Sequence, residues 1–113
     1  MLRLRRIESN MNYAFFANLA EAANAPAEGI LSRTLYQDDQ VKVVLFGFSA
    51  GQELSEHTAS TAATLHFVAG EATVTLGSDT REVGPNAWMH MQPNLVHSVR
   101  TKTPVVMLLY LLK

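Results

Sequence analysis

Two histidines, His57 and His97, are the side chains of this sequence best suited to chemistry. A neutral imidazole binds divalent transition metals, and it also accepts or donates protons near neutral pH. His57 is the last residue of the stretch Gly-Gln-Glu-Leu-Ser-Glu-His at 51–57, and His97 is the last residue of the stretch Gln-Pro-Asn-Leu-Val-His at 92–97. Two imidazoles hold a metal only when water or other side chains complete its coordination. The pair therefore predicts either the polar contacts of a small-molecule pocket or an incomplete site for a divalent transition metal.

Three other side chains are expected to contribute to the same pocket. Glu53 lies an even number of residues before His57, so in a regular strand both side chains point to one face. The Glu53 carboxylate could then bind a metal itself or orient His57 through a hydrogen bond. His90 and Trp88 share a face with each other and are predicted to line the pocket. The alternative for His90 is a satisfied, partly buried imidazole, and the alternative for Trp88 is a place in the core.

The elements that position these residues are predicted to be β-strands, which begin at residue 30. Short runs of apolar and β-branched residues alternate with turn residues at close intervals, the pattern of an antiparallel sandwich or barrel. Asp38, Gly77 and Asn86 mark turns, because these residue types favour turn conformations. Before the strands, an alanine-rich stretch predicts a helix over residues 12–23. The predicted strands are 30–37, 41–49, 53–59, 64–69, 71–76, 80–83, 87–91, 96–100 and 105–112.

Two of these strands, 41–48 and 105–112, are almost entirely apolar on both faces. An apolar outer face of an antiparallel sheet must be covered. The N-terminal segment, with Phe15, Phe16 and Leu19, could cover one such face, and a second copy of the chain could cover the other. We therefore expect a homodimer. The alternative is that the N-terminal segment covers both strands.

The first histidine motif resembles that of the cupins, a family of small antiparallel β-barrels. Gly51, His57 and Gly70 stand at the intervals of the family's first motif without an insertion. The resemblance runs over residues 51–99 and implies an all-β fold. This fold is a cupin antiparallel β-barrel of the jelly-roll or double-stranded β-helix type, preceded here by a short helical or irregular segment.

The second motif resembles that of the family at the histidine and departs from it at two glycines. His97 stands at the family's histidine position, and Pro93 lies one residue later than the family's proline. Asn86 and Asn94 occupy the two glycine positions. Asparagine tolerates the left-handed backbone conformation, so both turns are expected to survive.

The resemblance also indicates which groups are missing. Metal-binding cupins use three histidines and a glutamate, and the positions of the second histidine and of the glutamate are Ala59 and Ala63 here. His66 lies three residues after Ala63, so in a regular strand the two point to opposite faces. If Ala63 faces the interior, His66 is expected to be exposed or to lie at a dimer interface. The resemblance thus implies the fold of a frequent metal enzyme without its full ligand set, and it carries over no assigned activity.

Length and composition limit the number of domains, the kinds of partner and the location that the sequence predicts. The length of 113 residues predicts one domain, and the resemblance implies that it is a cupin domain over residues 12–113. Residues 1–11 are expected to form a disordered extension. The net charge is −1 and the basic residues cluster only near the N-terminus, so we expect no nucleic-acid partner. The longest apolar stretch, 105–112, is far below the roughly 20 residues of a membrane-spanning helix, so we expect no membrane partner. The absence of cysteine fits a cytoplasmic protein. Translation could begin at Met1 or at Met11.

Three functional hypotheses follow. The first is a small-molecule-binding cupin of unassigned activity, with its pocket inside the barrel around His57 and His97. The second is a metal-dependent oxygenase or isomerase with a reduced two-histidine site, whose cofactor is a divalent transition metal. The third is a non-catalytic, dimeric structural module. Whether the protein is an enzyme stays open, because a fold does not fix a function.

Overall fold

The structure is a computed structural model that describes residues 12–113. The disordered extension expected over residues 1–11 lies outside the described residues. Within the described range the predicted strands are confirmed, with boundaries that differ by no more than two residues. The elements are α1 (Leu19–Ala23), β1 (Ile30–Gln37), β2 (Val41–Phe48), β3 (Glu53–His57), β4 (Ala63–Ala69), β5 (Ala72–Leu76), β6 (Asp79–Val83), β7 (Trp88–Met91), β8 (His97–Thr101) and β9 (Val105–Leu112).

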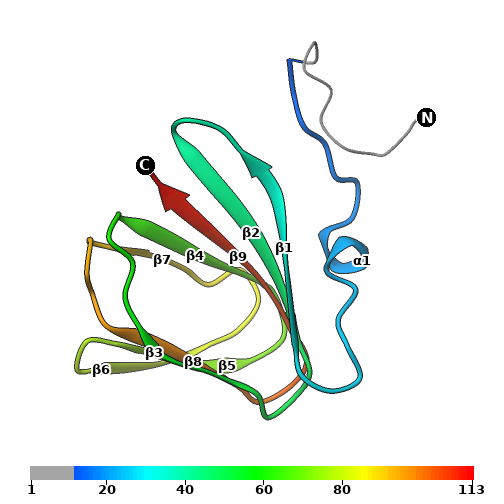
Figure 1. The fold of residues 1–113 in the computed structure, drawn as a ribbon. Helices are drawn as coiled ribbons and strands as arrows, with labels where there is room; N and C mark the ends of the chain where they lie inside the picture. The colour runs from blue at the N-terminus through cyan, green and yellow to red at the C-terminus, as the bar shows by residue number, and fades with distance from the viewer. Residues whose placement is uncertain (1–11) are drawn as a thin grey trace.

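The strands form two antiparallel sheets that pack face to face. One sheet has the order β1-β2-β9-β4-β7 and the other the order β3-β8-β5-β6. The two sheets come together at one end, the closed end, and diverge at the other, the open end (Figure 1). At the closed end, connections of two to four residues join β2 to β3, β4 to β5, β6 to β7 and β8 to β9. Each short connection places its two strands opposite each other, which is the jelly-roll arrangement that the sequence predicts.

The main core lies between the two sheets. Its buried members are Phe48, Ala63, Leu65, Phe67, Ala72, Val74, Met91, Val99, Val105 and Met107. They come from alternate positions along the strands, so one face of each strand lies in the core and the other points outward. Met91 and Met107 are fully buried and fill the core, as their flexible, apolar side chains predict.

Asparagine and glycine adopt left-handed conformations at the turns expected from the two histidine motifs. Asn86 and Asn94 have φ angles of 74° and 69°, so both adopt the left-handed conformation that was expected at the two glycine positions. Gly70 has a φ of 88°, and a Cβ atom there would overlap the backbone carbonyl of Pro104. Glycine is therefore required at residue 70 both by the backbone conformation and by the space available.

The N-terminal helix is shorter than predicted. It covers Leu19–Ala23 rather than residues 12–23, because the Asn18 side chain accepts a hydrogen bond from the Glu21 amide and starts the helix there. Asn24 ends the helix in a left-handed conformation, with φ of 46°. Within residues 12–113, no helix is long and apolar enough to cross a membrane.

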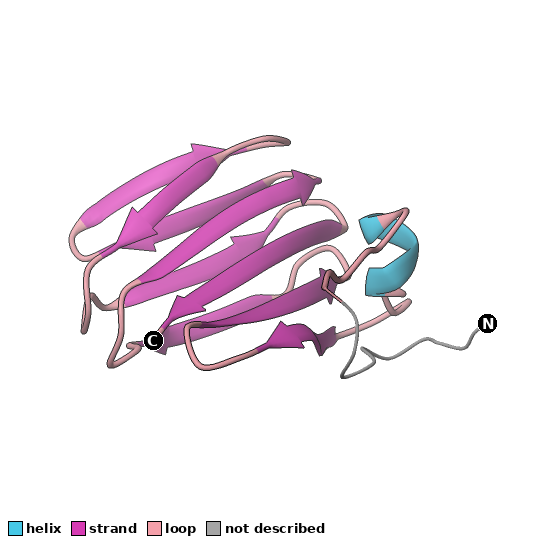
Figure 2. Ribbon diagram, turned by 90° about the horizontal axis from the view of Figure 1, so that it is seen from above, coloured by secondary structure: helices cyan, strands magenta, loops and turns pink. Residues whose placement is uncertain are grey.

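The N-terminal arm, defined as residues 12–24, covers part of the outer face of the five-stranded sheet. A second buried cluster forms there, in which Phe16 and Leu19 pack against residues of β1, β2 and β9. Arg33 of β1 fastens the arm, because it donates a hydrogen bond to the Ala22 carbonyl and lies over the Phe16 ring. Phe15 was expected to help cover the sheet, but its side chain is 74% exposed and does not belong to this cluster. In Figure 2, α1 lies beside one end of the strands.

Candidate functional site

His57 and His97 lie side by side on the inner face of the four-stranded sheet. His57 pairs with His97 and Leu54 pairs with Val99, with a register shift between the two pairs. This β-bulge adds one residue to β3, so Leu54 and His57 share a face although they are three residues apart. Val99 belongs to the main core, so the shared face is the inner one. The two imidazole rings meet edge to face, with centroids 4.1 Å apart.

The two rings differ in their access to solvent. His97 begins β8 and is only 4% exposed. His57 is the last residue of β3 rather than a residue in the middle of a strand, and it is exposed at the open end of the sandwich. The pair therefore extends from the buried interior, at His97, to the solvent, at His57.

Backbone carbonyl groups fix the tautomer of both imidazoles. His57 Nδ1 lies 2.8 Å from the Ser55 carbonyl oxygen, and His97 Nδ1 lies 2.9 Å from the Leu95 carbonyl oxygen. A carbonyl oxygen only accepts hydrogen bonds, so Nδ1 must carry the proton in each ring. In the neutral form, each Nε2 then holds a lone pair. Each ring of the pair can therefore accept a hydrogen bond or a proton at Nε2.

The surroundings of His97 favour its neutral form. Burial lowers the pKa of the His97 imidazole, and the charge of His57 lowers it further, whereas the hydrogen bond to the Leu95 carbonyl acts in the opposite direction. Burial is the largest of these causes, because an imidazolium loses its hydration when it is enclosed. The Nε2 of His97 is therefore available as an acceptor over a wider pH range than that of a free histidine.

Glu53 does not share the inner face with His57, so that expectation is wrong. It pairs with Arg100 in β8, three positions from inward-facing His97 and one from inward-facing Val99. Its carboxylate accepts a hydrogen bond from Arg100 at 3.1 Å on the outer side of the sheet. The physical reason is the β-bulge, which reverses the side-chain alternation between residues 53 and 57.

Trp88 and His90 are also on an outer face, so the expectation that they line the pocket of the histidine pair is wrong. Trp88 pairs with His66 and His90 pairs with Thr64, while the intervening Leu65 lies in the core. The register with β4 therefore turns both side chains outward. His66 also points outward, as the sequence predicts for an inward-facing Ala63.

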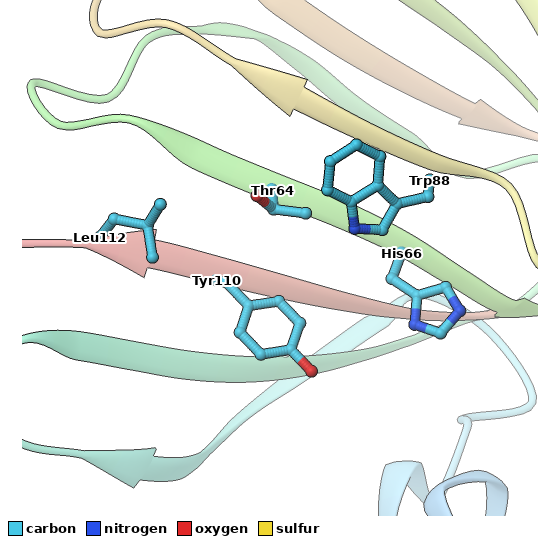
Figure 3. A pocket seen from close by; sticks show the side chains of 5 residues that line it. All are labelled: Thr64, His66, Trp88, Tyr110 and Leu112. Carbon is cyan, nitrogen blue, oxygen red and sulfur yellow. The ribbon is translucent and has the colours of Figure 1, made fainter.

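The outward-facing side chains form a shallow groove along β4, here called the outer groove. Its volume is about 280 Å³, and Figure 3 shows the five side chains that line it. The Trp88 and His90 rings are stacked with centroids 6.4 Å apart, and His90 Nδ1 lies 2.9 Å from the Thr64 hydroxyl. The lining residues are Thr64, His66, Trp88, Tyr110 and Leu112.

Lys42 was not among the residues expected at the site, yet it lies on the inner side of the open end. Lys42 pairs with Leu111, and Leu111 pairs with Ala63 of the main core, so the three share the inner face. Lys42 lies on β2, opposite the strand that carries His57. Lys42 lies six residues before Phe48 in the same strand, and residues an even number apart share a face. This spacing could have placed the Lys42 charge on the core side of the strand.

The inner face does not offer a complete set of metal ligands. Ala63 is buried in the core at the start of β4, and Ala59 lies in the loop between β3 and β4, where its carbonyl accepts a hydrogen bond from the Asn94 amide. Among residues 12–113, no group of three or more His, Cys, Asp or Glu side chains is arranged to hold a metal ion. The two imidazoles supply only part of a stable coordination sphere, so the residues present do not fit a tightly bound metal.

Comparison with solved structures shows a widespread fold. A conserved protein of unknown function from Streptococcus pyogenes is 23% identical, with a TM-score of 0.81, over 98% of this chain and 97% of that one. A cupin superfamily protein from Desulfitobacterium hafniense is 24% identical, with a TM-score of 0.79, over 98% of each chain. A cupin 2 conserved barrel domain protein from Leptotrichia buccalis is 25% identical, with a TM-score of 0.78, over 85% of this chain and 47% of that one.

Sequence comparison alone finds no relative: no protein-family model and no curated protein matches the chain. The structural likeness therefore establishes the fold that the two histidine motifs predict. At these identities it carries no activity, so the function has to be argued from the site.

Proposed function

We propose that this chain, a cupin by its fold, binds a small organic molecule at the open end of its sandwich, with His57 and His97 as the polar contacts. The observation that carries the proposal is the arrangement of the two rings. Both have Nδ1 bound to a backbone carbonyl, so each leaves Nε2 as its free polar atom, and the ring centroids lie 4.1 Å apart. Fixed polar groups beside an apolar surface are typical of a ligand site.

The groups around the pair indicate the class of ligand. A neutral Nε2 accepts a hydrogen bond, so the matching ligand group is a donor such as a hydroxyl. Leu111, whose side chain is only partly buried, lies on the inner face of the opposite sheet and favours a ligand with an apolar part. Lys42 adds a positive charge on that same face, which favours an anionic group such as a carboxylate. A small hydroxy acid has all three features.

Ligand binding by the histidine pair needs no metal. Ala59 and Ala63 leave the pair with fewer ligands than a stable metal site requires, and the donor set within residues 12–113 does not replace them. The imidazoles then act directly on the ligand, through hydrogen bonds, rather than through a bound ion.

Ligand-observed NMR with a panel of small hydroxy acids and alcohols tests the proposal on chelator-treated protein. We expect ligands that bind the native chain to lose about tenfold or more in affinity for His57→Ala, because a hydrogen bond to a buried ligand group is lost. His66→Ala is the matched control and should bind as the native chain does. His57→Ala is preferred to a change at His97, because the exposed ring can be removed with little effect on folding.

Two results would overturn the proposal. In the first, every ligand of the panel that binds does so equally well to the native chain and to His57→Ala. In the second, none of the panel binds at the open end, which the imidazole signals of His57 and His97 report directly. Circular dichroism of each variant establishes that the comparison is made between folded proteins.

A further inference from the structure

Within residues 12–113, one part of the outer face of the five-stranded sheet is covered by the N-terminal arm, and no described segment covers the part over β4. The N-terminal arm packs over β1, β2 and β9, where its Phe16 and Leu19 are partly buried. The outer groove lies beside it, over β4. Tyr110 of β9 lines both the outer groove and the apolar recess beneath the arm, so the outer groove is continuous with the covered part of the face.

The outer groove has the composition of a protein interface. It is lined by Trp88, Tyr110 and Leu112 with Thr64 and His66, and none of these is Lys, Arg, Asp or Glu. Aromatic side chains are enriched and most charged side chains are depleted at the centres of protein interfaces. Trp88 is 64% exposed, which is unusual for a side chain so large and apolar. The groove is also shallow and, at about 280 Å³, below the range of roughly 300–1,000 Å³ typical of small-molecule pockets.

The arm presents a second apolar surface on the same side of the sheet. Phe16 and Leu19 point toward the sheet, whereas Tyr13 and Phe15 are 72% and 74% exposed. The stretch 12–20 contains no charged residue. The outer face therefore carries an uncharged aromatic ridge beside an uncharged aromatic groove.

We propose that two copies of this chain pair through this face about a twofold axis, so that Tyr13 and Phe15 of each copy pack into the outer groove of the other. A twofold axis brings any patch of one copy against the patches of its twin, so a ridge and a groove on one face meet reciprocally. A stable interface buries about 800 Å² on each partner, more than the outer groove alone can offer, so the proposed contact includes the arm as well as the groove.

Charge favours a second copy over an unrelated partner. In a symmetric pair, each charged group near the axis lies close to its own twin, and like charges repel. The ridge and the groove lack permanently charged side chains, so the same surface can meet itself without that penalty. A strongly charged partner would find no complementary charge in the groove.

The intrinsic fluorescence of Trp88 tests the proposal on the unmodified chain, which contains no other tryptophan. When two copies pair, the indole leaves water, so its emission maximum should shift to shorter wavelength as the protein concentration rises. Analytical ultracentrifugation over the same concentrations should give a monomer–dimer equilibrium with the same midpoint. A monomer at every concentration, or a dimer whose formation leaves the Trp88 emission unchanged, would overturn the proposal.

Variants of the ridge and of the groove test the reciprocal contact. Phe15→Ala and Trp88→Ala should each raise the dissociation constant by about tenfold or more, the effect of removing an aromatic anchor. Val96→Ala is the matched control, because Val96 is an exposed apolar side chain in the loop before β8, away from the outer groove. An unchanged dissociation constant in both aromatic variants would refute the contact.

Cysteine cross-linking identifies which surfaces meet, and the chain has no native cysteine to interfere. Protein carrying Phe15→Cys is mixed with protein carrying Leu112→Cys and oxidised. A mixed dimer is expected from this pair and not from Phe15→Cys with Ser78→Cys, which lies in the turn between β5 and β6 of the other sheet. Equal cross-linking in both mixtures would show random collision and contradict the proposal.

Discussion

Replacing His97 by glutamine should remove a pH-dependent part of the free energy of unfolding. In the folded protein, burial lowers the pKa of His97 from the ordinary value of 6.5. Between that value and the lower folded pKa, the unfolded chain binds more protons than the folded one. The free energy of unfolding therefore decreases as the pH falls through this window. Because a single proton is involved, the free energy of unfolding changes by at most about 1.4 kcal/mol per pH unit.

The sign and the size of this effect follow from the position of the ring. The stabilising contribution of neutral His97 is fully present above pH 6.5, where the imidazole of the unfolded chain is also neutral, and it is lost as the pH falls through the folded pKa. His57 contributes to the lowering of this pKa, so His57→Gln should narrow the window in which the loss occurs.

Urea unfolding of chelator-treated protein, followed by circular dichroism above and below pH 6.5, measures the effect. The native chain should lose stability relative to His97→Gln as the pH falls, and the difference between the two should be constant above pH 6.5. Parallel pH profiles for the two proteins, or a gain in stability of the native chain on acidification, would refute the reasoning.

Two further predictions concern the closed end and the metal ligands. Gly70→Ala should reduce the free energy of unfolding by more than about 2 kcal/mol, because it adds a Cβ against Pro104 at a positive φ. Gly84→Ala is the control: its added Cβ has no neighbouring atom within 4 Å, so it should change the free energy of unfolding by less than about 1 kcal/mol in the same urea experiment. Ala59→His combined with Ala63→Glu should create a site that retains one divalent metal per chain after dialysis, measured by plasma mass spectrometry, whereas the native chain should retain less. Equal metal content in the two proteins would contradict the inference that the native ligand set is incomplete.

The sequence predicts the strands well because strand formation leaves a local signal. Apolar alternation within β5 and turn residues such as Asp38 and Asn86 act over a few residues, and each can be read without knowing its neighbours in space. The left-handed conformation of Asn94 follows in the same way. These signals suffice for the fold, which the structural comparisons confirm.

The candidate site is less predictable, because the face of each side chain depends on pairing between strands. The β-bulge before His57 moves Glu53 to the outer face, and no residue type in β3 marks the extra position. Trp88 and His90 point outward because of their register with β4, a strand more than 20 residues earlier in the chain. The tautomers of the histidine pair depend on two carbonyl groups that only the folded backbone brings into place.

The contrast between the two ends of the sandwich has a consequence for how such a protein can diversify. The four short connections at the closed end are sterically constrained, as the lack of space for a Cβ at Gly70 illustrates. The loops 58–62 and 92–96, in contrast, border the histidine pair. Sequence variation in these two loops can alter what is recognised while the scaffold stays intact. The hydrogen bond from the Asn94 amide to the Ala59 carbonyl ties the two loops together. A library for new specificities would therefore randomise them jointly, since a change of length in one displaces the other.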